Sequence, residues 1–272
     1  MAAKAALIAG SGLVTVAVPE RLHTIMECKL TEAMTSSIPS KDGLVFSSES
    51  LNPIIKMLTG KTSILLGPGL GTEPETKKFV FDLLKEIEIP IIIDADGLNA
   101  LEDEWEKISA LKKNIILTPH PGEMSRMVKM NTSDLLANQI KLTTSFSKRK
   151  NIYIVLKHAR SLIATPDGNY FINITGNPGL ASGGTGDILA GYIAGLSAQQ
   201  YTAEESLLAG VFLHGLASDL AVKDIGEKEL IASDILEYFS KARWLIESDP
   251  TPFQGIYVPY QFPDYSEGNF HD

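Results

Sequence analysis

Short, wholly apolar runs alternate with longer amphipathic runs along most of this chain. Aliphatic and β-branched residues fill the short runs, and glycine, proline or polar residues end each of them. Continuous apolarity is typical of strands that are buried on both faces, whereas apolar positions every three or four residues favour helices. The pattern predicts strands at 12–18, 62–67, 89–96, 114–119 and 152–157, and helices at 73–88, 98–111, 122–130 and 133–150.

This alternation predicts an α/β fold with a mainly parallel central sheet and helices on both faces. A hairpin is expected at 161–174, turned at a Pro-Asp-Gly sequence, and two apolar helices at 187–198 and 203–223 follow it. With 272 residues, 44% of them hydrophobic, the chain suits one large domain over 1–246.

The first residues read as a helix end, a glycine stop and a strand. They are not read as a signal peptide, because Gly10 and Gly12 interrupt the apolar stretch. The longest apolar runs fall short of the roughly 20 residues that a bilayer span needs. We therefore expect no membrane partner.

Charge and cysteine content narrow the partners and the compartment. The formal net charge is −9, from 33 acidic and 24 basic residues, which argues against nucleic acid or an anionic membrane as the main partner. A single cysteine, Cys28, leaves no internal disulfide and fits a reducing compartment. The expected location is the cytoplasm.

Polar and glycine-rich segments follow four of the predicted strands. In a parallel α/β sheet, ligands bind outside the carboxyl ends of the strands, so these segments are expected to share one edge. Each by itself could be only a tight turn with a helix cap. Four together indicate a binding site, and they read GPGLG at 67–71, DADGLNAL at 94–101, TPHPGE at 118–123 and KHARS at 157–161.

A further glycine-rich segment, NPGLASGGTGDILAG at 177–191, precedes an apolar helix. Glycines ahead of a helix let successive backbone N–H groups point into one concavity, and the helix N-terminus adds unpaired donors and partial positive charge. The segment therefore predicts an anion site. It is not a P-loop, because no lysine follows Gly186.

Asp187 stands where a P-loop would carry its lysine. We expect the helix dipole to depress its proton affinity, while the carboxylate can still orient and deprotonate a hydroxyl group. An anion site with such a group suggests phosphoryl transfer to an alcohol. The alternative is that Asp187 only caps the helix.

These motifs together identify a resemblance. The segment 177–199 resembles the G-T-G-D signature of the ribokinase-like kinases, and more closely that of one branch, the ADP- or ATP-dependent NAD(P)H-hydrate dehydratases. Two of the other segments, DADGL and TPHPGE, are similar to sequences that separate this branch from thiazole, pyrimidine and pyridoxal kinases. GPGLG occurs in the same order, and the resemblance spans residues 12 to about 222.

The resemblance implies a ribokinase-like fold and a repair reaction. Hydrated NADH or NADPH, the S epimer with a hydroxyl at C6, is returned to the normal cofactor while ADP or ATP is consumed. This makes the protein a carbon–oxygen lyase that uses Mg²⁺ and a nucleotide as phosphate donor. The family's reaction agrees with the phosphoryl transfer to an alcohol that the residues alone suggest. Transfer of phosphate to the hydroxyl group makes it a better leaving group than water.

The resemblance also assigns roles to residues. Asp187 corresponds to the proposed catalytic group beside the substrate, and Gly69 and His120 correspond to substrate-contacting positions. A lone histidine at a strand end could equally satisfy a neighbouring backbone group. The nucleotide-binding positions that the resemblance implies are Lys157, His158, Ala159, Arg160, Ser161, Asn177, Gly183, Gly184, Thr185 and Gly186.

Asp94 and Asp96 end a predicted strand among these segments. One of them could help to place Mg²⁺ through water, because Mg²⁺ keeps several waters and takes few carboxylates. Turn formation before Gly97 explains them equally well, so no direct metal ligand is assigned.

The chain departs from the family pattern in three places. Family members carry a further strand and a glycine-containing turn ahead of the first helix, so part of the substrate pocket is expected to be missing. The family's K-G-x-x-T reads KHARS here, which keeps a hydroxyl at Ser161. The segment 247–272 is rich in proline and aromatic residues, and we expect this tail to pack along the domain or a neighbouring subunit.

Two further expectations concern assembly and the apolar helix at 203–223. The resemblance favours a homo-oligomer, a tetramer in particular, and an epimerase domain as a possible partner. His214 falls among apolar positions of that helix, so we interpret it as a buried core histidine.

Two other functions remain open from the sequence. The chain could be a kinase of a vitamin-like alcohol that keeps its phosphorylated product, or a module that binds nucleotide without catalysis.

Overall fold

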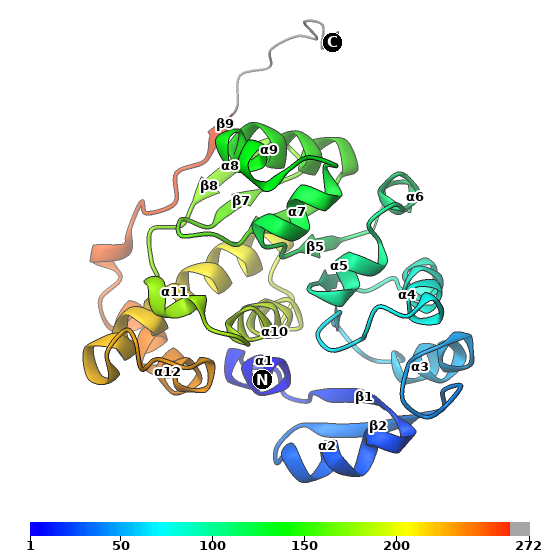
Figure 1. Cartoon of the computed structure of the whole chain (residues 1–272). Helices are drawn as coiled ribbons and strands as arrows, with labels where there is room; N and C mark the ends of the chain where they lie inside the picture. The colour runs from blue at the N-terminus through cyan, green and yellow to red at the C-terminus, as the bar shows by residue number, and fades with distance from the viewer. Residues whose placement is uncertain (112, 262–272) are drawn as a thin grey trace, which may run out of the picture.

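The structure is a computed structural model that describes residues 1–111 and 113–261. It contains a seven-stranded sheet whose strands are ordered as they occur along the chain. This sheet lies at the centre of the domain, between helices (Figure 1). Its first four strands are parallel and the remaining ones join antiparallel. The strands are β3 (Ile64–Leu66), β4 (Ile91–Ile93), β5 (Ile115–Leu117), β6 (Tyr153–Leu156), β7 (Leu162–Ala164), β8 (Asn169–Ile172) and β9 (Tyr260–Gln261).

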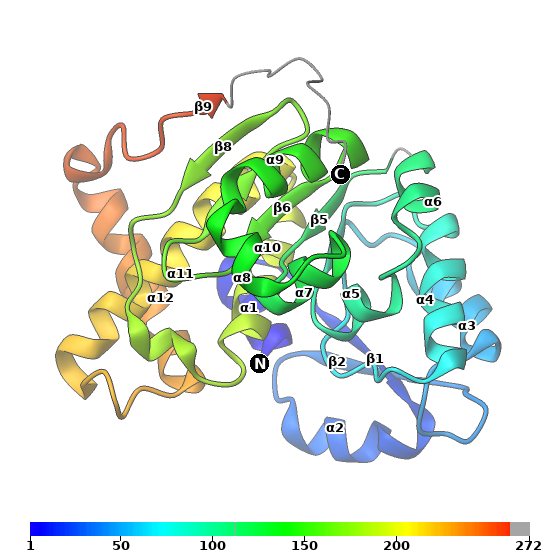
Figure 2. The same cartoon turned by 45° about the horizontal axis from the view of Figure 1, so that its top comes forward.

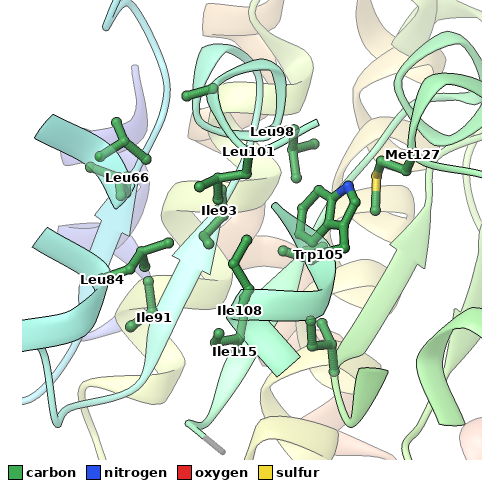
Figure 3. Close-up of a cluster of buried hydrophobic side chains, with 14 of the residues drawn as sticks. Leu66, Leu84, Ile91, Ile93, Leu98, Leu101, Trp105, Ile108, Ile115 and Met127 are labelled. Atoms are coloured by element: carbon green, nitrogen blue, oxygen red, sulfur yellow. The ribbon is translucent and has the colours of Figure 1, made fainter. Parts of the chain in front are cut away.

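The central strands are buried on both faces, which explains their continuous apolar runs. Successive side chains of a strand point to opposite faces. Ile91 and Ile93 accordingly belong to one core cluster and Ile92 to another. Figure 3 shows the first cluster, where these two isoleucines meet Leu84, Leu98 and Trp105.

Helices cover both faces of the sheet, as the sequence predicts. The first core cluster contains side chains from α4 to α7 and from α9, and the cluster on the other face contains side chains from α10 and α11. The helices are α4 (Pro74–Glu86), α5 (Asp96–Ala100), α6 (Trp105–Ala110), α7 (Pro121–Met127), α8 (Thr132–Ala137), α9 (Gln139–Lys150), α10 (Thr185–Ser197), α11 (Ala203–Ile225) and α12 (Ala232–Ser248).

The first helix, α1 (Ala2–Ala9), packs tightly against α10 through small residues. A Cβ placed on Gly191 would lie 2.2 Å from the carbonyl oxygen of Ala2, so only glycine permits this approach. The helix ends at Gly10, which is left-handed with φ 114°. The expected helix and glycine stop are confirmed.

The predicted first strand is present but lies in a different sheet. Residues Thr15–Pro19 form β1, which pairs in parallel with β2 (Met34–Ile38) in a separate two-stranded sheet beside α2 (His23–Lys29) (Figures 1 and 2). The prediction of one central sheet was wrong for this strand. Hydrophobic pattern shows that a segment is extended but does not show which strand it pairs with.

Two predicted helices are each broken into two. The segment 98–111 forms α5 and α6, and the segment 133–150 forms α8 and α9 with a break at Asn138. The side-chain amide of Asn138 donates to the carbonyl oxygen of Asp134 at 3.1 Å. This local bond replaces the backbone partner of a continuing helix, which explains the break.

The other long elements agree with the sequence. The hairpin of β7 and β8 turns where Gly168 donates to the carbonyl oxygen of Thr165, and Gly168 has φ 92°. The sequence argument did not anticipate α2, β2, α3 (Leu51–Met57), α12, β9 or the short 3₁₀ turns η1 (Glu20–Leu22), η2 (Ser48–Ser50), η3 (Pro178–Ala181) and η4 (Thr251–Phe253).

The helix α11 is long and apolar enough to cross a membrane by length and composition, contrary to the sequence expectation. Within its most apolar window, 67% is buried inside the protein. It packs against α10 and α12, and its buried His214 lies beside Phe239 with ring centroids 6.2 Å apart. Packing in the domain accounts for its apolar character. The interpretation of His214 as a buried core residue is confirmed, with 7% of it exposed, although its Nε2 has no hydrogen-bond partner among the described residues.

Candidate active site

The loops after β3 and β4 are locked together at the carboxyl edge of the sheet. A Cβ on Gly67 would lie 1.7 Å from the carbonyl oxygen of Asp94, and the backbone N–H of Gly71 donates to Oδ2 of Asp96 at 2.9 Å. The GPGLG and DADGL segments therefore form one unit. The bond from Gly71 explains Asp96 as a residue that stabilises the turn.

Gly69 sits at the exposed tip of the first loop. The N–H of Leu70 donates to the carbonyl oxygen of Gly67, and Gly69 has φ 72°, which is the conformation of a turn with proline second and glycine third. A Cβ at Gly69 would meet no described atom within 4 Å. The turn conformation, rather than crowding within the protein, is what requires glycine here.

A backbone outlier stands between the two aspartates of the second loop. Ala95 has φ 49° and ψ −123°, a combination that non-glycine residues rarely adopt. The turn that it makes, closed by a bond from the N–H of Gly97 to the carbonyl oxygen of Asp94, directs the chain from β4 into α5. Strain of this kind is concentrated at functional sites.

Lys157 joins this unit to the segment after β6. Its Nζ lies 2.6 Å from Oδ1 of Asp94, and the two side chains are 20% and 2% exposed respectively. A Cβ on Gly186 would lie 3.2 Å from the same Nζ. The DADGL, KHARS and GGTGD segments, which are far apart in sequence, therefore converge on one ion pair.

The glycine-rich loop ahead of α10 has the form that the sequence predicts for an anion site. Gly184 is left-handed, with φ 93°, and no described side chain caps the helix. The hydroxyl of Thr185 lies within hydrogen-bonding distance of the carbonyl oxygens of Leu180 and Ser182, at 2.8 and 2.9 Å. The side chain of Thr185 therefore holds the loop. The N–H of Thr185 donates to the carbonyl oxygen of Ser182 at 3.5 Å, and no described side chain caps the N–H groups that follow it in α10.

Asp187 occupies the first turn of α10 and is partly buried. Since no described side chain caps α10, the alternative that Asp187 serves only as a cap is not supported. Burial, followed by the negative charge of Asp94, raises the pKa of Asp187, and the N-terminal ammonium, followed by Lys157, opposes that shift. The expectation that the helix dipole would depress its proton affinity was wrong, because desolvation of the carboxylate outweighs the dipole.

His120 caps α7 as well as facing the site. Its Nδ1 accepts from the backbone N–H groups of Gly122 and Glu123, at 3.0 and 3.3 Å, so its ring hydrogen lies on Nε2. Burial, then the positive charges of Lys157 and Arg126, lowers the pKa of His120. The lowered pKa favours the neutral ring. Its Nε2 lies 3.4 Å from Oε1 of Glu123, so a ligand would share this donor with the glutamate.

Glu123 is a site residue that the sequence argument treated only as a helix start. It is 6% exposed, its Oε2 accepts from the N–H of His120 at 2.7 Å, and burial raises its pKa. Lys157 and Asp94 both act on its titration. The capping-box spacing, a cap residue followed three positions later by glutamate, was the signal for this position.

The rest of the KHARS segment lies at the surface. His158, Ala159 and Arg160 are exposed, and Nη1 of Arg160 donates to the carbonyl oxygen of Ile174 at 2.8 Å. The hydroxyl of Ser161 lies 3.4 Å from the carbonyl oxygen of His158. These contacts place the segment beside the chain that leads into the anion loop.

The side chain of Asn177 is engaged within the protein. Its Nδ2 donates to Oγ of Ser218 and Oδ1 of Asp219, at 2.8 and 2.9 Å, and its Oδ1 accepts from the N–H of Gly179. Asn177 therefore fastens the start of the loop to α11. Further along the loop, Gly183 is exposed and a Cβ there would meet no described atom within 4 Å.

The site fits a Mg²⁺ ion that is held mainly by substrate phosphates rather than by protein side chains. Within the described residues no group of three or more His, Cys, Asp or Glu side chains could hold a metal ion. Asp94 and Asp187 repel each other, and the ammonium groups of the N-terminus and of Lys157 oppose the effect of that repulsion on Asp187. A Mg²⁺ ion that keeps most of its waters and binds chiefly to substrate phosphates needs no larger group of protein ligands.

A glycine-rich helix N-terminus, an ion pair and a partly buried carboxylate therefore meet at the carboxyl edge of an α/β sheet, which is where proteins of this fold class bind their ligands. The sequence profile of the NAD(P)H-hydrate dehydratase family matches residues 1–241. The chain belongs to that family.

Individual relatives agree with this assignment. The chain is 38% identical over 238 residues to a bifunctional NAD(P)H-hydrate repair enzyme from Moorella thermoacetica, covering 88% of this chain and 45% of the relative. It is 35% identical over 186 residues to an ADP-dependent (S)-NAD(P)H-hydrate dehydratase from Neisseria meningitidis, covering 66% of this chain and 62% of the relative. The chain thus spans about half the length of the bifunctional relatives.

A solved structure confirms the fold. The ADP/ATP-dependent NAD(P)H-hydrate dehydratase from Bacillus subtilis, co-crystallised with ATP and Mg²⁺, superposes with a TM-score of 0.71 at 27% identity, covering 90% of this chain and 84% of the other. The ribokinase-like α/β fold expected from the sequence is confirmed.

Proposed function

We propose that this protein dehydrates the S epimer of hydrated NADH or NADPH, using ADP or ATP as phosphate donor. The observation that carries the proposal is the position of Asp187, in the first turn of α10 behind the glycine-rich loop and in the field of the Asp94–Lys157 pair. Family membership supports the substrate, and the ADP-dependent and ADP/ATP-dependent relatives support the nucleotide.

Asp187 is the proposed base for the C6 hydroxyl of the substrate. The carboxylate takes the hydroxyl proton as the oxygen attacks the terminal phosphorus of the nucleotide. The bond to the shortened nucleotide breaks in the same step. Phosphate then leaves with the electrons of the C6–O bond, and a proton is lost from the neighbouring ring carbon, which restores the double bond. The raised pKa of Asp187 makes its carboxylate a better base near neutral pH.

Other groups of the site hold the reactants. The backbone N–H groups of residues 183–186 and the ammonium of Lys157 would donate hydrogen bonds to phosphate oxygens of the nucleotide. The Nε2–H of His120 would donate to the substrate. Mg²⁺, when bound, would neutralise negative charge on the nucleotide phosphates. Gly69 is exposed at the tip of its loop, and no described atom lies within 4 Å of the place where a Cβ would stand, so the substrate could approach the backbone there.

The direct test is to incubate the chain with hydrated NADH and Mg²⁺, with ADP and ATP in parallel. Return of NADH absorbance with stoichiometric phosphate release supports the dehydratase and identifies its donor. A stable phosphoester would instead indicate a kinase of an alcohol, and bound nucleotide without turnover would indicate a binding module.

Asp187→Asn should abolish turnover and leave nucleotide binding largely intact. Asp103→Asn, which removes a carboxylate that is 79% exposed and pairs with Lys129, is the matched control and should keep full activity. Retained turnover in Asp187→Asn would remove this residue from the proposed role.

Assembly and location are parts of the same proposal. Family resemblance supports a homo-oligomer, a tetramer in particular. Family resemblance supports an epimerase as a functional partner, and relatives that are described as bifunctional NAD(P)H-hydrate repair enzymes agree with a second activity beside the dehydratase. The single, exposed Cys28 supports a reducing, cytoplasmic compartment.

A further inference from the structure

The chain beyond residue 241 lies outside the match to the family profile, yet its described part returns to the domain. After α12, residues 251–261 run back along the protein and end as β9, which adds to the edge of the sheet beside β8 (Figure 2). We call residues 251–261 the C-terminal strap. The remainder of the predicted tail, 262–272, lies outside the described residues.

Aromatic rings fasten the strap to β8 and α11. Phe253 and Tyr257 both meet Phe212 of α11 edge to face, with ring centroids 5.8 and 6.0 Å apart. Tyr257 also meets Phe171 of β8 at 6.0 Å, and Tyr260 stacks on a tyrosine of the same strand. The strap is therefore a packed part of the domain, which agrees with the expectation that the tail packs along it.

Tyr257 makes a specific polar contact in addition to this packing. Its hydroxyl donates to Oδ1 of Asn173 at 2.8 Å. Asn173 is only 3% exposed, and its backbone N–H donates to the carbonyl oxygen of Ser161 at 2.9 Å. Tyr257 is thus connected to Ser161, the last residue of the KHARS segment, through Asn173.

The same asparagine also holds the chain that leads into the anion loop. Its Nδ2 donates to the carbonyl oxygen of Thr175 at 2.9 Å, and the hydroxyl of Thr175 lies 3.1 Å from its Oδ1. The next residue, Gly176, donates its N–H to Oδ2 of Asp219 at 2.9 Å. A Cβ on Gly215 of α11 would lie 2.2 Å from Oγ1 of Thr175, so this chain is held between α11 and the strap.

Asn173 therefore connects two segments of the site. Its backbone N–H bonds to Ser161 of the KHARS segment, and its side chain holds Thr175, which is followed by Gly176, Asn177 and the glycine-rich loop. Both segments belong to the proposed nucleotide pocket, and Arg160 already joins them by its bond to Ile174. The side chain of Asn173 is buried and needs all its partners, because an unmatched buried amide is costly.

We propose that the C-terminal strap supports the nucleotide pocket, and that Tyr257 is a positioning residue that holds Asn173 so that both segments keep their binding geometry. The inference rests on the proposed nucleotide site. It adds a residue from outside the family match, one that touches neither nucleotide nor substrate and acts through Asn173.

The first test compares Tyr257→Phe with Tyr260→Phe in the full-length chain, using ADP and ATP with Mg²⁺. Both changes keep the ring and remove one hydroxyl, but within the described residues the hydroxyl of Tyr260 makes no hydrogen bond. Tyr257→Phe should raise the Kd and KM for nucleotide about fivefold, the factor expected from one ordinary hydrogen bond, while kcat at saturating nucleotide changes less than twofold. Tyr260→Phe should leave all three constants within twofold of the original chain.

Equal nucleotide affinity in the two variants would overturn the inference and leave the strap as a packing element only. Failure of the unaltered chain to bind either nucleotide would be a different result, because it would remove the proposed function together with the inference that rests on it.

Hydrogen exchange provides a second test that does not depend on a variant folding. Coupling between two sites is reciprocal, so nucleotide binding to the unaltered chain should slow exchange in peptides from residues 251–261 as well as in those from 173–177. Slower exchange in the second set alone would also overturn the inference.

Discussion

Nζ of Lys157 lies 2.6 Å from Oδ1 of Asp94, in a pair where the carboxylate is 2% exposed. The two residues come from different strand ends, and Asp187 lies in the field of both. The pair, together with the N-terminal ammonium, therefore provides the charges that act on the proposed base.

The two members of this pair should shift the pH dependence of turnover in opposite directions. Asp94 helps to raise the pKa of Asp187, so Asp94→Asn should move the acid limb of the kcat/KM profile to lower pH. Lys157 opposes that rise, so Lys157→Met should move the limb to higher pH. Profiles that move together, or not at all, would contradict the electrostatic assignment.

Each of these changes should also destabilise the fold. Removing one member of a buried pair leaves an uncompensated charge, and we expect a loss of about 2 to 3 kcal/mol, reduced from the fully buried case because Lys157 is partly exposed. Urea denaturation at pH 7 measures this loss. The double variant should lose less than the sum of the single changes, because they share one interaction.

Two glycines of the GPGLG segment should respond very differently to alanine. Gly67→Ala would place a Cβ 1.7 Å from the carbonyl oxygen of Asp94 and should cost roughly 4 kcal/mol or more. Gly69→Ala has open space and only an unfavourable φ, so it should cost about 1 kcal/mol. Similar losses from the two changes, measured by urea midpoints, would show that the close approach at Gly67 is not needed.

Asp187→Asn should make the protein more stable at pH 7. The folded-state pKa of Asp187 is raised, so folding favours its protonated form, and that contribution is lost as pH rises through the folded pKa. Asparagine removes the cost of the buried charge. We expect a gain of about 0.5 kcal/mol, or 1 to 2 °C in Tm, after allowing for partial exposure. Calorimetry at pH 7 and near pH 4 should show the gain shrinking in acid.

His214 should govern part of the acid sensitivity of the fold. Burial lowers the pKa of His214 to about 4, whereas the unfolded chain takes up the proton near pH 6.5. Stability from the neutral ring is present above that range and is lost as pH falls from about 6.5 toward 4. At pH 5 the loss is of the order of 2 kcal/mol.

His214→Leu should therefore flatten the decline in Tm between pH 7.5 and pH 5. The exposed His158 offers a control, since His158→Gln should keep the decline of the original chain. An equal decline in all three proteins would mean that other groups cause it.

The sequence anticipated the central strands well, for a local reason. Strands such as β4 and β5 lie between two layers of helices, so all their residues are apolar. A continuous apolar run in the sequence therefore indicates a strand that is buried on both faces. It did not anticipate the pairing of β1 with β2 or the break at Asn138. The pairing depends on which segments meet in space, and the break depends on one side-chain hydrogen bond. The spacing of hydrophobic residues along the chain contains no information about either feature.

For the site, the order of the glycine-rich and acidic motifs was enough to place Asp187, His120 and Lys157 at one edge. The direction of the Asp187 pKa shift was not accessible in this way, because burial and the charge of Asp94 come from distant parts of the chain and outweigh the helix dipole. The folded structure was also needed to show that Nδ1 of His120 accepts hydrogen bonds from backbone N–H groups at the start of α7.

The amino-acid sequence by itself determined the layers of the fold, the anion loop and the family. Each of these can be recognised from the local pattern of residues or from the order of motifs along the chain. The tertiary structure decided the charge balance around Asp187 and the joining of Tyr257 to Asn173. Both arise from residues that are far apart in the chain, and their strength depends on distance and burial, which exist only after folding.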